Sequence, residues 1–360
     1  MGDAGLPPVA ARGMVNEDVR PGGRVVARVM AVTEVPGAGE WLGAELRDGD
    51  AWKVRLTEAH RREVLAAVHE INRTGGAGSE TGQGALEMSP ESFPLPALAP
   101  ILHRVRDELM DGRGFVLIQG VPVEELTERQ CEAAALGLAC HVGGIVPQGA
   151  ERAPLMHVRD TGADPSRSRT KSFQHSARLG YHSDPTDVVG LLCLRPARSG
   201  GLSSVVSSVA VHNELVRTRP DLAELLYQPW WHDRRTGDGP DSFFTKPICT
   251  RRPDGGISIA YGPDYLRSAQ RGAGVPPFTP AQEETMALLD DLTNDPRFAL
   301  TMDLRPGDLQ LLNNHVTLHS RTAYDDHPEP HRRRHLLRLW ITMARAGVSA
   351  VCCRAQQGRT

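Results

Sequence analysis

Two short stretches of the sequence, far apart along the chain, carry side chains that bind transition metals. The first stretch contains His182 and Asp184, and the second contains His319. Positions i and i+2 of an extended strand point to the same side, so the side chains of His182 and Asp184 can reach one ion. Two imidazoles and one carboxylate occupy one face of an iron(II) ion and leave its other positions open. The three residues therefore predict an iron site, provided that the fold brings the two stretches together.

Other histidines form similar patterns, because the sequence contains 14 of them. His212 and Glu214 have a His-x-Glu spacing, but they open a helical pattern, in which positions i and i+2 point to different faces. His327 and Glu329 flank a proline, and their Asp- and Pro-rich neighbours predict a surface turn. The pair that begins at His182 leads into an apolar strand pattern and is therefore preferred.

The third ligand has a competitor in His315, which lies four positions before His319. The two histidines share a face in a helix and also share a face on a strand, so periodicity does not choose between them. On the residues alone, both stay candidates.

The ordered set resembles the iron(II)- and 2-oxoglutarate-dependent oxygenases of the taurine dioxygenase and clavaminate synthase type. That family carries His-x-Asp/Glu, a distal histidine, and an arginine beyond it that binds the far carboxylate of 2-oxoglutarate. The resemblance covers roughly residues 95–345, and the ordered set is specific although His-x-Asp alone is common. It favours His319 over His315, because Leu318-His319-Ser320-Arg321 matches the distal segment of the family.

The resemblance also implies the residues that hold the cosubstrate. Arg338 is expected to anchor the far carboxylate, and Ser203 of Gly200-Gly201-Leu202-Ser203 is expected to add a hydroxyl. A buried arginine in an apolar strand needs an anionic partner. A dicarboxylate supplies one, and an internal Asp or Glu is the alternative. Arg334 is expected either to reach the metal-side carboxylate or to be solvated.

Three further residues are weaker candidates for substrate contacts. Gln148 lies where related amino-acid hydroxylases place a substrate-contacting glutamine. Asn313 and Asn314 follow a strand, and a turn role is as good an interpretation of them as a site role.

The activity that the resemblance implies is hydroxylation of a small molecule, an amino acid or a natural-product intermediate, with dioxygen consumed and succinate and carbon dioxide released. Desaturation and ring formation are related outcomes. Two other functions fit the same residues. One is a cupin-like metalloenzyme that does not use 2-oxoglutarate, and the other is a jelly-roll binding protein without enzymatic activity.

The pattern of elements favours an α+β fold, mainly β, with a double-stranded β-helix (jelly roll) core wrapped by helices. No Gly-x-Gly-x-x-Gly follows the apolar strand at Phe115, which disfavours a dinucleotide-binding fold. The expected helices span residues 57–72, 98–110, 127–140 and 279–292, and the expected strands span 114–120, 188–194, 205–209, 256–261, 309–312 and 335–343.

Three segments divide the chain in this interpretation. Residues 1–55 form a partly irregular N-terminal extension, residues 56–345 a single oxygenase domain with the jelly-roll core, and residues 346–360 a C-terminal tail. Polar segments at 74–94 and 159–178 contain few large apolar residues, so they are candidates for mobile loops or lids.

Composition excludes several classes of protein. The net charge of -3 gives no basic field for nucleic acid, and no apolar run is long enough to cross a membrane. The first residues have no apolar core of signal-peptide length, and the six cysteines form no Cys-x-x-Cys motif. We therefore expect a cytoplasmic enzyme with a small-molecule substrate and no nucleic-acid or membrane partner. Its oligomeric state does not follow from the sequence.

Overall fold

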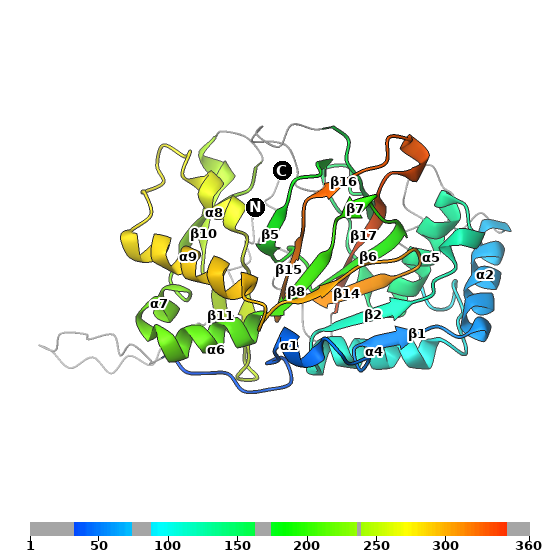
Figure 1. Cartoon of the computed structure of the whole chain (residues 1–360), viewed down its shortest axis with the longest axis horizontal. Helices are drawn as coiled ribbons and strands as arrows, with labels where there is room; N and C mark the ends of the chain where they lie inside the picture. The colour runs from blue at the N-terminus through cyan, green and yellow to red at the C-terminus, as the bar shows by residue number, and fades with distance from the viewer. Residues whose placement is uncertain (1–31, 74–87, 163–173, 236–238, 344–360) are drawn as a thin grey trace, which may run out of the picture. The chain divides into compact units, whose positions relative to one another are not determined.

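Two β-sheets form the centre of the structure, a computed structural model that describes residues 32–73, 88–162, 174–235 and 239–343 (Figure 1). All of these residues belong to one compact unit that begins at Val32. Side chains from both sheets share an apolar cluster that includes Phe115, Val189, Val205 and Leu312. The sheets therefore pack against each other through apolar side chains.

The larger sheet supplies one wall of the site. Its strands β1 and β2 run parallel, and its other pairs are antiparallel. In the order of hydrogen bonding it contains β1 (Lys53–Arg55), β2 (Phe115–Gln119), β14 (Leu309–Asn313), β6 (Val188–Arg195), β17 (His335–Thr342) and β3 (Gly144–Ile145), and β4 (Leu155–Val158) also pairs with β17.

The smaller sheet supplies the opposite wall and is antiparallel throughout. Its order is β13 (Leu300–Met302), β8 (Ser203–Ser207), β15 (Thr317–Arg321) and β5 (Leu179–His182). Three two-stranded ladders flank these sheets: β9 (Trp230–Asp233) with β10 (Phe243–Lys246), β11 (Cys249–Arg251) with β12 (Ile257–Ile259), and β7 (Ser199–Gly200) with β16 (Tyr324–Asp325).

Helices cover the sheets on two sides. The outer face of the larger sheet packs in one apolar core with α2 (Glu58–Arg73), α4 (Ala99–Asp111) and α5 (Glu128–Cys140). A second core joins the smaller sheet to α6 (Ser208–Thr218), α7 (Pro220–Leu225), α8 (Pro263–Ala269) and α9 (Pro280–Asn294), which lie at the opposite end from α2 in Figure 1. A short helix, α1 (Gly43–Leu46), precedes β1.

Local signals account for most of the predicted helices. Thr127 and Thr279 each form a capping box, in which the threonine side chain accepts from the N3 backbone and the N3 glutamine returns a bond. The helices that follow begin and end within two residues of the predicted bounds. The strand predicted over residues 205–209 was partly wrong, because Ser207 caps α6 by accepting a hydrogen bond from the backbone of Ala210, so the helix begins at Ser208.

Residues 32–55, which the sequence assigned to an N-terminal extension, pack with the domain. The indole of Trp41 lies 4.9 Å from the ring of Phe115, and β1 extends the larger sheet. Most of the two predicted loops, residues 74–87 and 163–173, and the predicted tail lie outside the described residues.

The described fold is a mixed α/β arrangement with many short strands, as the sequence predicted in outline. Among the helices of the described ranges, none is long and apolar enough to cross a membrane.

Candidate active site

Neighbouring strands bring the two metal-binding stretches together. His182 ends β5, and in the ladder with β15 it lies directly opposite His319. The centroids of the two imidazole rings are 4.2 Å apart. Asp184 lies two residues beyond β5, and one ligand atom from each of the three residues falls within 4.8 Å of the other two. The fold thus gathers the three predicted ligands at one point.

The two imidazoles are prepared to bind a cation. The Nδ1 atom of His182 lies 2.9 Å from the carbonyl oxygen of Gly180, so Nδ1 donates to that oxygen and Nε2 is the nitrogen left for a metal. In the described part of the chain, Nδ1 of His319 is buried without a hydrogen-bond partner. Burial lowers the pKa of His319 to about 3. Its ring is therefore neutral near pH 7, and a neutral ring is the form that binds a metal.

Asp184 is held as an ionised carboxylate. Burial alone would raise its pKa, but Arg338 and the neighbouring histidines outweigh burial, so the pKa of Asp184 lies below its usual range. The indole Nε1 of Trp340 donates to Oδ2 at 3.0 Å, and the backbone N–H of Asp184 donates to Asn314 Oδ1 at 2.9 Å. These bonds fix the carboxylate beside the two imidazoles, and the donor set fits a divalent first-row metal.

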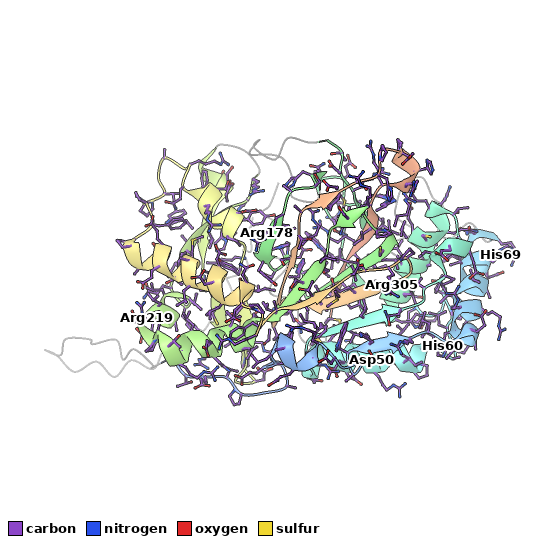
Figure 2. The ribbon with its side chains drawn as sticks, viewed as in Figure 1. Asp50, His60, His69, Arg178, Arg219 and Arg305 are labelled. Carbon is purple, nitrogen blue, oxygen red and sulfur yellow. The ribbon has the colours of Figure 1, made fainter. Side chains whose placement is uncertain are left out.

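The competing histidines have other partners. His315 lies 2.7 Å from Ser258 Oγ through Nδ1 and 3.0 Å from Asp187 Oδ1 through Nε2, so both of its nitrogens are engaged. His212 is buried in α6 and lies 2.8 Å from the hydroxyl of Tyr227. His60 and His69 lie on α2, on the helical side of the larger sheet (Figure 2).

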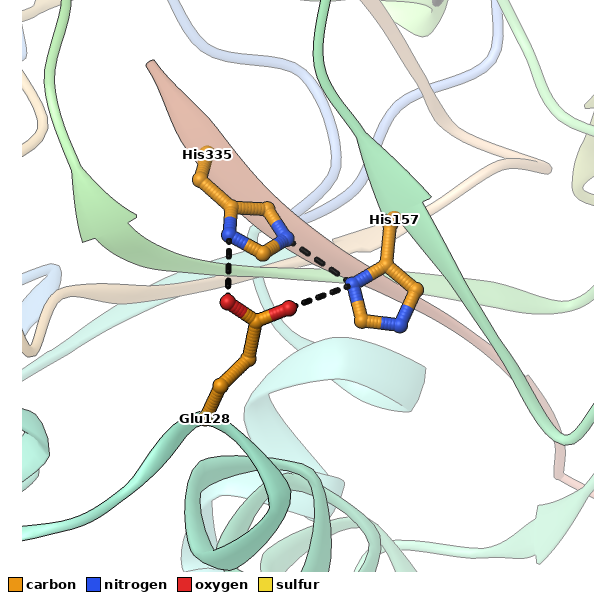
Figure 3. A group of neighbouring side chains, drawn as sticks. All are labelled: Glu128, His157 and His335. Atoms are coloured by element: carbon orange, nitrogen blue, oxygen red, sulfur yellow. Dashed lines mark hydrogen bonds and ion pairs between the residues drawn. The ribbon is translucent and has the colours of Figure 1, made fainter. Parts of the chain in front are cut away.

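A second group of metal-type ligands was missed by sequence reasoning. Glu128, His157 and His335 also place ligand atoms within 4.8 Å of one another (Figure 3). Here, however, the imidazoles satisfy each other, with His157 Nδ1 2.9 Å from His335 Nε2. Arg195 Nη2 lies 3.0 Å from the other nitrogen of His335 and 3.9 Å from Glu128. The group is a closed hydrogen-bonded network that joins α5, β4 and β17.

A cavity of about 290 Å³ opens beside the triad, and the described residues of its wall include five arginines and two carboxylates. Arg338 is close to the metal ligands, because its Nη1 lies 3.5 Å from Asp184 Oδ2. Its guanidinium also lies 5.0 Å from the ring of Trp340. Arg338 therefore lies beside an internal carboxylate, as the alternative to a dicarboxylate partner predicts, and its role toward the cosubstrate stays a prediction.

Arg334 lies on the same wall of the cavity and is 5% exposed. It is therefore not solvated, which corrects one of its two expected positions. Its Nη1 has no hydrogen-bond partner within the described residues, and its guanidinium lies 5.1 Å from the ring of Tyr324. Arg321 lies 4.8 Å from the same ring, and burial with the charge of Arg334 lowers the pKa of Arg321 to about 10. Arg321 and Arg334 are therefore two buried cations beside one tyrosine ring, and their mutual repulsion favours the binding of an anion between them.

The glycine pair before Ser203 brings backbone close to these arginines. Gly200 and Gly201 have positive φ angles of 72° and 69°. A Cβ on Gly201 would lie 3.1 Å from Arg334 Nε, and one on Gly200 would lie 2.3 Å from the carbonyl oxygen of Ala323. Ser203 lines the cavity, but its hydroxyl donates to Gln310 Oε1 at 2.9 Å. The donor of Ser203 is thus already used inside the protein.

A family model described as taurine catabolism dioxygenase TauD, TfdA family, matches residues 79–340. This chain belongs to that family. Membership confirms the resemblance seen in the sequence, and it confirms that the protein is an iron(II)/2-oxoglutarate-dependent dioxygenase, an oxidoreductase.

Individual relatives agree with this placement. FR-33289 synthase of Streptomyces rubellomurinus is 30% identical over 320 residues, which cover 86% of this chain and 90% of that protein. A taurine hydroxylase-like protein of Stachybotrys chartarum is 28% identical over 313 residues, 83% of this chain and 77% of that protein. Among solved structures, asparagine oxygenase in complex with Fe(II), a hydroxyasparagine and succinate has a TM-score of 0.63 at 19% identity, covering 81% of this chain and 93% of that one. At that identity the likeness shows the fold.

In this dioxygenase the three weaker substrate candidates contact protein groups. Gln148 accepts from Arg338 Nε at 3.0 Å and donates to the carbonyl oxygen of Arg338 at 3.0 Å. Asn313 donates to the carbonyl oxygen of Leu109 and accepts from the backbone of His315, and these contacts favour its turn interpretation over a substrate contact. Asn314 positions Asp184, and its Nδ2 donates to the carbonyl oxygen of Thr186.

Trp340 and Arg321 are site residues that the sequence did not single out. Both lie next to residues that it did: Trp340 is two positions from Arg338 on β17, and Arg321 is two positions from His319 on β15. Because side chains at i and i+2 share a face of a strand, this spacing was the signal that could have found them.

Proposed function

We propose that this dioxygenase uses iron(II), 2-oxoglutarate and dioxygen to hydroxylate an unactivated C–H bond of a small molecule. Succinate and carbon dioxide are the coproducts. The observation that carries the proposal is the convergence of His182, Asp184 and His319 at the wall of a cavity that also holds Arg334, a buried arginine whose Nη1 has no hydrogen-bond partner among the described residues. A metalloenzyme that does not bind 2-oxoglutarate has no use for that arginine, so the cupin-like alternative is disfavoured.

The substrate that we propose is an amino acid or a natural-product intermediate. A solved relative in fold, asparagine oxygenase, was obtained with a hydroxylated amino acid and succinate, and a sequence relative carries the name of a synthase. Bound iron(II) would supply oxygen activation, with one atom of dioxygen entering succinate as 2-oxoglutarate is oxidatively decarboxylated and the other entering the hydroxylated substrate.

The residues of this chain perform the binding and positioning. His182, Asp184 and His319 would hold the metal through the two imidazole Nε2 atoms and one carboxylate oxygen. Trp340 holds Oδ2 of Asp184, which leaves Oδ1 for the metal. The burial of Asp184 and His319 keeps water away from these ligands and strengthens their interaction with a cation.

For the cosubstrate, the contacts support an exchange of the roles expected for the two arginines. Arg338 touches Asp184, so we assign it to the carboxylate near the metal. Arg334 lies four residues earlier, immediately before β17, about 13 Å away at the usual rise of a strand. Its Nη1, which has no hydrogen-bond partner in the described part of the chain and lies near Arg321, suits the far carboxylate. Ser203 can still accept or share a hydrogen bond there, but its donor is engaged with Gln310.

We also propose that the two packed sheets are the two sides of a jelly roll and that the enzyme works in the cytoplasm. The shared apolar cluster between the sheets supports the first proposal. The second is supported by the cysteines of the described residues, Cys131, Cys140, Cys193 and Cys249, which are free.

Anaerobic titration of 2-oxoglutarate into the iron(II)-loaded enzyme tests the function directly. We expect a metal-to-ligand charge-transfer absorbance that saturates as the cosubstrate binds, and succinate release on admission of oxygen with a panel of amino acids and related compounds. Iron that binds without any absorbance change on addition of 2-oxoglutarate would contradict the proposal and favour the 2-oxoglutarate-independent reaction.

A further inference from the structure

Two consecutive arginines, Arg234 and Arg235, line the cavity that contains the metal triad. Consecutive side chains of an extended strand point to opposite faces, so both would not normally reach one cavity. Arg235, however, has a φ of 56°, a left-handed conformation that is strained for a residue with a side chain. Asp233 fixes this turn by accepting from the backbone N–H of Arg235 at 2.7 Å. The turn presents both guanidinium groups to the same cavity.

Each guanidinium lies on an aromatic ring. Arg234 lies 4.2 Å from the ring centroid of Phe244, and Arg235 lies 4.7 Å from that of Tyr265. Stacking holds the plane of a guanidinium while its N–H edge stays free for a ligand. Within the described ranges the Arg234 guanidinium makes no hydrogen bond or ion pair, and Nε of Arg235 is buried without a partner.

Among the residues that the structure describes, neither of these two arginines has an acidic partner. Asp184 is paired with Arg338, and the buried Asp233 is paired with Arg271 at 3.0 Å. Asp264 offers Arg235 only its backbone carbonyl, at 3.4 Å. The proposed cosubstrate uses the arginines on the other wall. Two positive charges therefore remain beside a metal that is itself a cation, and this excess attracts an anion.

We propose that Arg234 and Arg235 form the subsite for a dianionic phosphate or phosphonate group of the primary substrate. The inference rests on the proposed function, because the subsite orients a substrate toward the triad. A phosphate monoester carries close to two negative charges above about pH 7, which matches two guanidiniums, whereas a carboxylate or sulfonate carries one. A second cavity of about 320 Å³ shares Asp184, Arg234 and Tyr265 with the first and gives room for the rest of the molecule.

The test uses calorimetric titration of the enzyme loaded with iron(II) and 2-oxoglutarate, without oxygen, at about pH 8. The probes are methyl phosphate, methylphosphonate, methanesulfonate and acetate. Methyl phosphate and methylphosphonate should bind most tightly. Arg234→Gln and Arg235→Gln should each weaken them by about tenfold or more, because each variant loses a charge-assisted hydrogen bond. Arg305→Gln is the matched control, since Arg305 is exposed and outside both cavities (Figure 2).

The 2-oxoglutarate charge-transfer absorbance is followed in the same samples. Its retention shows that a variant is folded, and Arg234→Lys and Arg235→Lys, which keep the charge but lose the fork, should give intermediate losses if a glutamine variant does not fold. The subsite is refuted if the glutamine or lysine variants bind methyl phosphate like the parent. Equally tight binding of methanesulfonate or acetate, or displacement of 2-oxoglutarate by methyl phosphate, refutes it too. Absence of the absorbance in the parent is a separate result, which contradicts the proposed function instead.

Discussion

His319 differs from its neighbour His315 in what its ring nitrogens contact. The ring of His315 is held by Ser258 and Asp187, whereas Nδ1 of His319 has no partner within the described residues. No described protein group therefore fixes the ring of His319 through Nδ1, and its Nε2 can bind the metal. We therefore expect His319→Ala to lose iron after anaerobic reconstitution and His315→Ala to retain it, measured as iron bound per chain.

The same measurement tests the other two ligands. His182→Ala and Asp184→Ala should abolish iron binding, and His212→Ala should leave it nearly intact because His212 is satisfied by Tyr227. Full iron occupancy in Asp184→Ala, or a loss confined to His315→Ala, would contradict the triad.

Arg338 on β17 and Arg334, immediately before that strand, differ in their partners. Loss of one side of a buried charge pair costs roughly 2–5 kcal/mol, so Arg334→Ala should weaken 2-oxoglutarate binding by roughly 30-fold or more. Ser203→Ala should cost no more than about 1 kcal/mol, one neutral hydrogen bond. The affinity is read from the charge-transfer absorbance during anaerobic titration, with iron content as the control. A larger loss in Arg338→Ala than in Arg334→Ala would restore the original assignment of Arg338 to the far carboxylate.

At the scale of elements, the Glu128, His157 and His335 network links a helix to two strands, and it makes stability depend on pH. Burial lowers the pKa of His335 from 6.5 to about 4. The unfolded chain therefore takes up a proton before the folded protein does. The contribution of His335 to the free energy of unfolding is fully present above about pH 6.5. It decreases as the pH drops toward about 4, by at most about 1.4 kcal/mol per pH unit.

Urea unfolding as a function of pH measures this effect. His335→Gln should flatten the decline between about pH 6.5 and 4 relative to the parent. The matched control is His69→Gln on α2, an exposed histidine that should leave the slope unchanged (Figure 2). Other buried histidines contribute to the total decline, so the difference between the two variants is the decisive quantity. Equal slopes in both variants would show that the network does not control the titration.

Helices and strands that are determined by neighbouring residues could be predicted from the sequence. Contacts between different elements could not. The capping boxes at Thr127 and Thr279 are visible as short motifs, and the helices follow them. The network around His335 is not visible, because its members come from three elements whose pairing no local pattern records. The left-handed turn at Arg235 was likewise hidden, because the Asp233 side chain that closes it is held in place by Arg271, far along the chain.

For the whole molecule, the metal site exists only when distant parts of the chain are folded together. Iron and 2-oxoglutarate should therefore stabilise the native state by mass action, by about 2.7 kcal/mol for a ligand at 100 times its dissociation constant. Thermal unfolding of the parent should shift upward with iron(II), and further with 2-oxoglutarate. His319→Ala should show no iron-dependent shift, and an equal shift in that variant would place the stabilising iron elsewhere.

At this scale the sequence predicted the triad and the family, because the order of the motifs and the spacing between them can be read directly from the sequence. The sequence analysis assigned Arg338 to the far carboxylate of 2-oxoglutarate and offered the metal-side carboxylate for Arg334. The roles that we now propose for the two arginines are the reverse. The spacing of both arginines from His319 is compatible with either role, and only the contact of Arg338 with Asp184 separates them. The order of strands in the sheets was also out of reach, since β14 inserts between β2 and β6 from far along the sequence.

The strand that carries His182 lies at the edge of the smaller sheet, with β15 as its partner. It is four residues long, and its ladder with β15 contains a register shift. A metal bound to His182 and His319 would link β5 to β15 and hold this edge strand in place. Without iron, amide hydrogens of β5 should exchange faster with solvent, and the loosened strand would expose groups that pair with other chains. When iron is depleted during expression, we therefore expect the protein to aggregate, and this aggregation to be observed before a loss of enzymatic activity is measured.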